Sequence, residues 1–92
     1  MGKAENKIEQ YLVKQAKKHK FFCCKFVSPA TDGVPDRLLI GNGHTIFIET
    51  KSSTGKLREL QKETIALMRS QGATVYVASS KQQIDSIIAA LL

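Results

Sequence analysis

The 92-residue sequence has little of several features that mark common protein classes. It has no tryptophan, two prolines and two cysteines. None of its apolar runs approaches the roughly 20 residues that a membrane-spanning helix needs. The start, Met1-Gly2-Lys3-Ala4-Glu5, has no apolar signal-peptide core, and Asn6 stands where a myristoylation signal has serine or threonine. We therefore expect a cytosolic protein without a lipid anchor.

Potential zinc ligands are also scarce. Cys23 and Cys24 are adjacent, so a strand would direct them to opposite faces, and His19 and His44 are too few and too poorly spaced to complete a site. We expect both thiols to be reduced packing residues.

Negative charge is limited as well. Eight acidic residues face 14 lysines and arginines, which gives a formal net charge of +6 and an isoelectric point near 9.6. This excess favours a polyanionic partner, with nucleic acid ahead of an anionic membrane. Because aromatic residues make up only 7% and no recognition helix is evident, we expect recognition of DNA shape more than of base sequence.

The hydrophobic content of 42% is enough for the core of one domain, residues 1–92, and no repeat, low-complexity segment or linker divides the chain. Periodicity predicts a helix over 3–19, a strand over 21–27, a hairpin over 36–51 and a strand over 73–78. A second helix is marked by Leu57, Leu60, Ile65, Leu67 and Met68 and ends at Gly72, and a last helix follows a cap at Ser79 or Ser80. The order αβββαβα, with strands apolar on both faces, predicts an α/β fold whose mixed sheet has helices on two sides.

The most informative segment is the hairpin around Asn42-Gly43, a dipeptide typical of a type I′ turn. A loop centred there pairs Leu38 with Phe47 and Asp36 with Glu49. Opposed residues have Cβ atoms about 4.5–5.5 Å apart, so two carboxylates repel unless something positive lies between them. A divalent cation is the natural candidate.

Lys51 falls on the same face as Glu49, roughly 7 Å further along the strand at about 3.4 Å per residue. A cation held by two acids, with an ammonium beside it, suits the activation of water against a phosphodiester. Mg²⁺ prefers such oxygen ligands and keeps several waters. An ordinary surface ion cluster is the alternative, but the apolar residues beside both acids argue that the strands are buried.

Two further polar residues fall near apolar stripes. Glu5 lies inside the stripe of the first helix, with Glu9 at its edge, and Gln61 lies near the stripe of the second. Glu5 is either a helix-end acid that reaches solvent or a residue turned toward Asp36 and Glu49, with Glu9 as the fallback for that role. Gln61 is either a boundary residue or a side chain that reaches the site from the helix start.

Several spaced motifs together resemble one known group of enzymes. They are Gly33-Val34-Pro35-Asp36, Glu49-Thr50-Lys51, Gly55-Lys56 and Gln61, preceded by Glu5 and Ile8. This set resembles the PD-(D/E)XK nuclease superfamily and, within it, the VRR-NUC (virus-type replication-repair nuclease) family of stand-alone phage and prophage type. The resemblance covers nearly the whole chain and implies a restriction-endonuclease-like core with a metal-dependent active site.

The resemblance also implies roles for individual residues. Asp36 and Glu49 would bind Mg²⁺ or Mn²⁺, with the Thr50 main-chain carbonyl as a further ligand. Lys51 would position or help to deprotonate the attacking water, although it could instead bind phosphate as a point charge.

Other residues would support this centre. Gln61 would act from the second helix, and Glu5 would complete the acidic pocket or hold a second ion through water. By their place near the motifs, the candidates for phosphate contacts are Lys25, Arg37, Lys56 and Arg58.

The resemblance further implies a bacterial or phage-infected host cell and a role in DNA repair or replication. Small members of the family resemble homodimeric enzymes that resolve four-way DNA junctions, so we expect a Holliday-junction resolvase. The dimer would use the first or the last helix. Alternatives are a non-catalytic basic DNA-binding module on a nuclease fold, a nuclease for flaps or other DNA structures, and a small protein-interaction domain.

Overall fold

The computed structural model describes residues 3–52 and 54–92, with the side chains of residues 3–6 outside that description. The elements are α1 (Lys3–Lys18), β1 (Phe22–Lys25), β2 (Arg37–Gly41), β3 (His44–Thr50), α2 (Glu59–Ser70), β4 (Val75–Ala78) and α3 (Lys81–Leu91). This order confirms the predicted αβββαβα arrangement. Within the described ranges, no helix is long and apolar enough to cross a membrane.

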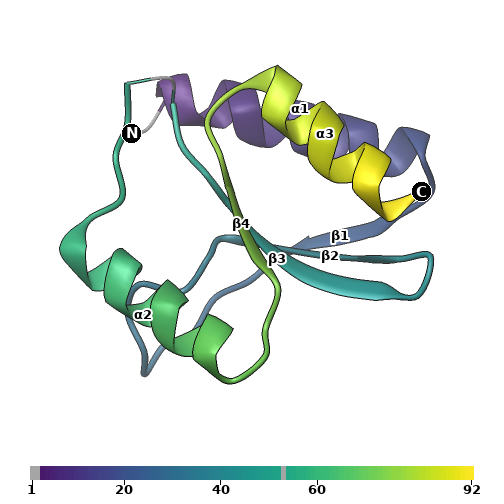
Figure 1. Ribbon diagram of the computed structural model, residues 1–92. Coiled ribbons are helices and arrows are strands. Elements are labelled where there is room, and N and C mark those ends of the chain that lie inside the picture. Colours follow the sequence, from purple (N-terminus) through teal and green to yellow (C-terminus); the bar gives the residue numbers. More distant parts are fainter. Residues whose placement is uncertain (1–2, 53) are drawn as a thin grey trace.

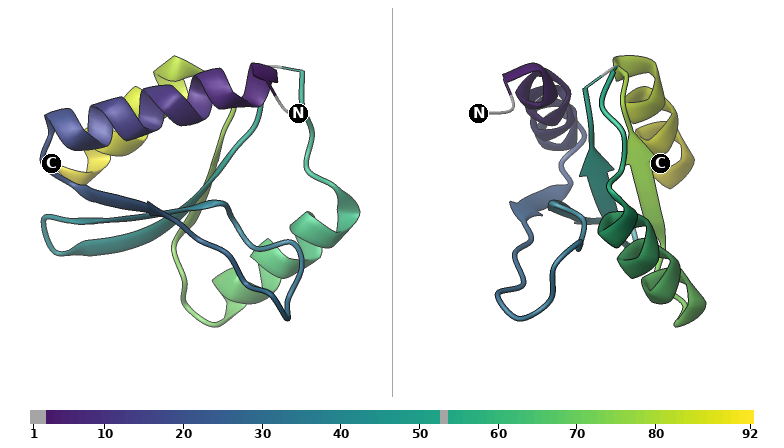
Figure 2. Two further views of the ribbon diagram at one scale, coloured as in Figure 1. Left: turned by 180° about the vertical axis from the view of Figure 1, so that it is seen from behind. Right: turned by 90° about the vertical axis from the view of Figure 1, so that its left-hand side faces the viewer.

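The strands form one sheet in the order β1-β2-β3-β4. The pairs β1–β2 and β2–β3 are antiparallel, whereas β3–β4 is parallel. Helices α1 and α3 lie together on one side of the sheet and α2 lies on the other (Figure 1). The view from behind in Figure 2 shows the same arrangement. The predicted mixed sheet with helices on two sides is therefore confirmed.

The core lies between the sheet and the α1–α3 layer. Its fully buried members include Leu12 of α1, Leu39 of β2, Ile48 of β3 and Ile84 of α3. Burial of each such side chain contributes about 1.5–3 kcal/mol relative to leaving it in water. This layer fixes β2 and β3 as a rigid base for the residues at their open ends.

The opposite face of the sheet is less covered than the sequence predicts. Ile40 is 37% exposed, and α2 leaves Leu60 and Leu67 exposed by 43% and 67%. The buried residues of α2 are Gln61 and Ile65. The expectation that the strands are buried on both faces is therefore wrong, because a single helix, packed near β4, covers only part of this side.

The β2–β3 hairpin has the predicted turn and register. Asn42 and Gly43 have φ values of 53° and 83°, as a type I′ turn requires, and Leu38 lies opposite Phe47. The last residue pair of the ladder is one step short of Asp36 and Glu49. The two acids therefore meet at the open end of the hairpin, where the strands cease to pair.

Some element boundaries differ from the predictions. Strand β1 is shorter than 21–27 because Phe21 turns into the core below Gly41. Its ladder with β2 ends at Lys25, although the Phe26 amide still donates to the Asp36 carbonyl at 3.0 Å. The second helix begins at Glu59, not at Leu57. Ser80 caps α3, because its hydroxyl oxygen accepts a hydrogen bond from the main-chain amide of Gln83 at 3.1 Å.

The expected packing role fits Cys23, which packs against the core. Cys24 is half-buried, and its role stays a prediction.

Candidate active site

Glu49, near the end of β3, is the most buried acid in the described part of the chain, with 3% of its surface exposed. Its Oε1 accepts from the Asp36 amide at 3.1 Å, and its Oε2 accepts from Gln61 Nε2 at 2.9 Å. Lys51 Nζ lies 3.2 Å from the same Oε2. These contacts compensate the cost of burying a carboxylate. The structure thus brings together four residues that the sequence indicated.

Asp36 lies directly before β2 and faces Thr50. Its Oδ2 accepts from the Thr50 hydroxyl at 3.1 Å, and its Oδ1 lies a long 3.4 Å from the Thr50 amide. Burial, and then the carboxylates of Glu49 and Glu9, raise the pKa of Asp36 to about 6. The sequence indicated only the main-chain carbonyl of Thr50. The signal that could have indicated a role for the hydroxyl is the position of Thr50 between two charged residues, Glu49 and Lys51.

Lys51 is held at both its main chain and its side chain. Its amide donates to the Ala78 carbonyl at 2.9 Å, which ties it to the end of β4. Its side chain is 16% exposed and meets Glu49 on the face that strand alternation predicted. The ammonium is therefore positioned beside the Glu49 carboxylate and not free in solvent.

Gln61 uses both ends of its amide. While Nε2 donates to Glu49, Oε1 accepts from the Arg58 amide at 3.1 Å at the start of α2. Gln61 is 6% exposed, so it reaches the site from the helix start and is not a boundary residue on the surface. One side chain thereby links the beginning of α2 to the buried carboxylate.

The loop before Asp36 packs closely against α2 at Gly33. Gly33 has φ +85°, and a Cβ atom there would lie 2.7 Å from Thr64 Oγ1 and 2.8 Å from the Leu60 carbonyl. The Thr64 hydroxyl also donates to the Asp32 carbonyl at 2.9 Å. The sequence alone does not predict this contact, although a glycine two residues before Pro35 is a signal for a close approach of the backbone. Glycine allows the two segments that carry Asp36 and Gln61 to touch.

The sequence pattern of the VRR-NUC domain family matches residues 2–82. The chain belongs to the VRR-NUC family. It is 39% identical over 88 residues to "Putative nuclease p44" of Acyrthosiphon pisum secondary endosymbiont phage 1, with 95% of this chain and 94% of that protein covered. A solved VRR_NUC domain has a TM-score of 0.83 and 25% identity, with 94% of this chain and 95% of that chain covered. Membership of this family supports a nuclease function.

A second charge cluster of this VRR-NUC domain lies on the α1 side of the sheet. Glu9 is only 9% exposed, and its Oε2 lies 2.9 Å from Arg37 Nε and 3.5 Å from Lys25 Nζ. The fallback acid of the first helix is thus paired with two of the proposed DNA-binding cations. Arg37 keeps 14% of its side chain exposed, whereas Lys25 keeps 67%.

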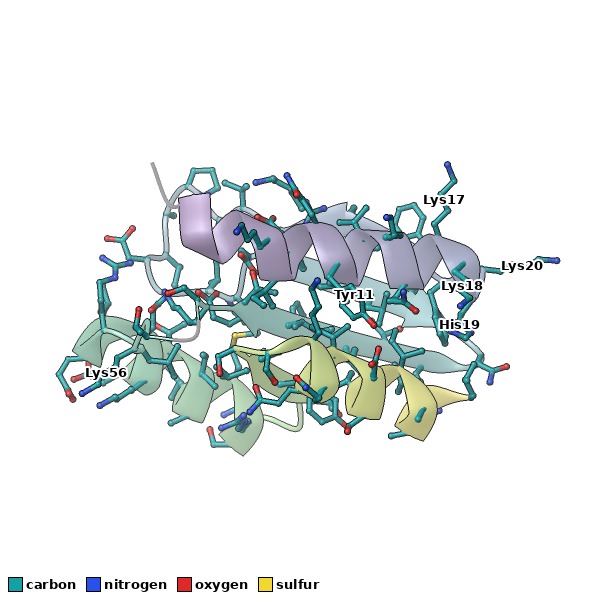
Figure 3. The ribbon with its side chains drawn as sticks, turned by 90° about the horizontal axis from the view of Figure 1, so that it is seen from above. Tyr11, Lys17, Lys18, His19, Lys20 and Lys56 are labelled. Atoms are coloured by element: carbon teal, nitrogen blue, oxygen red, sulfur yellow. The ribbon has the colours of Figure 1, made fainter. Side chains whose placement is uncertain are left out.

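The remaining predicted residues fall outside these clusters. Lys56 and Arg58 are exposed in the segment that leads into α2, and Figure 3 shows Lys56 at one end of the molecule beside that helix. Glu5 belongs to α1, but its side chain is outside the described part, so its place in the site stays a prediction.

The donor chemistry of the VRR-NUC site fits Mg²⁺. Burial, and then repulsion from Glu49 and Glu9, raise the pKa of Asp36, and a cation between the carboxylates would offset both effects. Within the described residues, no group of three or more His, Cys, Asp and Glu side chains could hold a metal. Two carboxylates nevertheless suit Mg²⁺, because this ion usually takes one or two of them and completes its shell with water and phosphate oxygens.

Proposed function

We propose that this VRR-NUC chain is a metal-dependent, structure-selective DNA endonuclease that acts as a homodimeric Holliday-junction resolvase. The observation that carries the proposal is the buried Glu49 carboxylate, bound by Lys51 and Gln61 beside Asp36. A structural ion pair would need neither the second carboxylate nor the glutamine. The phage relative and the family match support the nuclease part of the proposal.

In the proposed mechanism, Asp36, Glu49 and the Thr50 main-chain carbonyl would hold Mg²⁺, and Mn²⁺ would substitute for it. When bound, the ion supplies Lewis acidity toward the attacking water and a phosphoryl oxygen. The chain's own contribution is to fix these ligands before substrate arrives. Gln61 orients Glu49, and the Thr50 hydroxyl orients Asp36.

Lys51 has two roles in this proposal. In the substrate-free protein its ammonium pairs with Glu49 Oε2 at 3.2 Å, which keeps it within reach of a phosphate or a water at the carboxylates. With substrate bound, it aligns the water and neutralises charge that develops on the phosphoryl group. Glu5 completes the acidic pocket, directly or through water.

The proposed DNA contacts around the site are Lys25, Arg37, Lys56 and Arg58. They lie on both sides of the acids: Lys25 and Arg37 face α1, whereas Lys56 and Arg58 precede α2. They would position phosphates without reading bases, which suits recognition by shape. The phage relative supports action in the cytoplasm of a bacterial or phage-infected cell.

A four-way junction explains the proposed dimer. Resolution requires two nicks in opposed strands, and a two-fold dimer presents two identical sites related by the symmetry of the junction. One face of the first or the last helix would form the interface. Both helices lie on the same side of the sheet, whereas α2, which carries Gln61, lies on the other (Figure 1).

The test compares cleavage of end-labelled four-way junction, flap and linear duplex DNA in Mg²⁺, Mn²⁺ or EDTA. The proposal predicts paired, symmetrical nicks in the junction that require the metal. Metal-dependent cutting of flaps or duplex alone would retain the nuclease and refute the resolvase. Tight binding of the junction without cleavage in either metal would favour a non-catalytic DNA-binding module.

A further inference from the structure

A groove between α1 and the edge strand β1 begins beside the active site and leads toward the far end of the molecule. Its first part, ≈ 520 Å³, includes Arg37, Lys25, Lys14 and Lys17 in its lining. Its second part, ≈ 530 Å³, shares Lys17 with the first and continues to Lys20. The groove thus starts at the neighbour of Asp36 in the sequence.

The groove has a strong excess of positive over negative charge. Five cationic side chains line it against the single carboxylate of Glu9, a net charge of +4, whereas the whole chain has +6. Glu9 is 9% exposed and bound to Arg37 and Lys25, so it offsets part of their charge, and the groove keeps the net excess of +4. Such a row of cations in a groove attracts a polyanion.

One cation at the active-site end is fixed in place. Donation from Arg37 Nε to Glu9 at 2.9 Å uses one of the five N–H groups of the guanidinium. Because the guanidinium of Arg37 is already held by a buried partner, it loses little conformational entropy when it binds a phosphate. Its planar shape also allows two parallel hydrogen bonds to the phosphate. The pairing with Glu9 is therefore preorganisation of Arg37.

The apolar side chains in the groove also suit DNA. Val13 and Phe22 line it and are exposed by 36% and 61%, so carbon surface lies between the cations. Deoxyribose presents carbon atoms between successive phosphates, and sugar and phosphate contacts together position a duplex. From Glu9 to Lys17, α1 rises about 12 Å, the length of three to four base-pair steps.

We propose that the α1–β1 groove binds the phosphates of one strand of a duplex DNA arm that extends from the active site. The proposal rests on the nuclease function above, because it assigns the path of that enzyme's substrate. The partner is double-stranded DNA, recognised by its backbone spacing and not by its bases.

The test compares two double variants of equal charge. Lys14→Gln with Lys17→Gln removes two groove cations, and Lys18→Gln with Lys62→Gln removes two exposed cations that do not line the groove. Figure 3 shows Lys17 extending away from α3, whereas Lys18 lies on the side of α1 that faces α3. Circular dichroism confirms that each variant is folded before binding is measured.

Binding to a labelled four-way junction and to a duplex is measured by fluorescence anisotropy in EDTA over a series of KCl concentrations. For two lost phosphate contacts, the slope of log K against log salt should become shallower by about 1.8, with about tenfold weaker binding near physiological salt. The control variant should keep a slope close to that of wild type.

The outcomes separate this inference from the proposed function. Equal slopes and affinities for the two double variants would overturn the groove, even if wild type cleaves junctions. Loss of binding in the groove variant alone would support the groove, even if wild type cleaves nothing. The same variants are also tested for binding to anionic lipid vesicles. If the groove variant loses binding to the vesicles but binds DNA as wild type does, the assignment to DNA is overturned.

Discussion

Gln61 Nε2 donates to Glu49 Oε2 at 2.9 Å, across the gap between the start of α2 and the end of β3. Because Gln61 Oε1 accepts from the Arg58 amide at the same time, its side chain cannot turn away without leaving a helix-start donor unsatisfied. The orientation of the buried carboxylate is therefore coupled to the position at which α2 begins.

The first prediction replaces this amide. Gln61→Glu removes the donor to Glu49 and adds a second negative charge beside it. The free energy of unfolding should fall by about 1–3 kcal/mol, and cleavage should fall in parallel because Glu49 loses its orientation. Urea denaturation and single-turnover cleavage measure the two effects. Gln82→Glu, at an exposed position of α3, is the control for the added charge. If Gln61→Glu has the same stability and cleavage rate as this control, the role of the Gln61 amide is refuted.

The second prediction concerns pH in metal-free buffer. The pKa of Asp36 is raised from 3.8 to about 6 in the folded state, so the folded protein binds more protons than the unfolded chain between those values. Stability should therefore decrease as pH rises from about 4 to 6 and remain lower above 6.

Asp36→Asn removes this penalty. At pH 8, the free energy of unfolding of the variant should exceed that of wild type by about 1–2 kcal/mol, a value reduced to account for the partial exposure of Asp36. Near pH 4 the two values should match. Thermal denaturation in EDTA at both pH values measures the difference, with the exposed Asp32→Asn as control. An Asp36→Asn variant less stable than wild type at pH 8 would contradict a net cost of the buried Asp36 charge.

The third prediction concerns metal binding without DNA. Mg²⁺ at ten times its dissociation constant should stabilise wild type by about 1.4 kcal/mol, because it binds only the folded protein. The melting temperature at pH 8 should rise with Mg²⁺ in wild type and change much less in Asp36→Asn. A similar rise in both proteins would exclude Asp36 as a ligand.

The fourth prediction tests the contact between the loop before Asp36 and α2. Gly33 and Gly43 both have positive φ, but a Cβ atom clashes only at Gly33, since that of Gly43 meets nothing within 4 Å. Gly43→Ala should cost about 1 kcal/mol from backbone strain alone. Gly33→Ala should cost about 1–3 kcal/mol more, because α2 must move. Chemical denaturation compares them, and equal losses would show that the contact is unimportant.

Much of the site followed from local rules that the sequence displays directly. The Asn42-Gly43 turn sets the register that opposes Asp36 and Glu49, and alternation along β3 puts Lys51 beside the latter. Both rules depend on neighbours within one hairpin. They required no knowledge of how the helices pack.

The features that the sequence did not predict depend on tertiary packing. An amphipathic pattern gives the apolar side of a helix but not what covers it, and Leu60 and Leu67, which mark that side of α2, are exposed. The burial of Glu9 with Arg37 needs the approach of α1 to β2, 28 residues away in the chain.

The most direct test of the account is single-turnover cleavage of a labelled four-way junction in Mg²⁺ by wild type, Asp36→Ala and Lys51→Ala. Lys62→Ala, at an exposed position that pairs with Glu59, is the control. The account predicts that wild type and the control cut the junction, whereas both site variants fold and bind it but do not cut. Cleavage by either purified site variant at the wild-type rate would contradict the proposed active site.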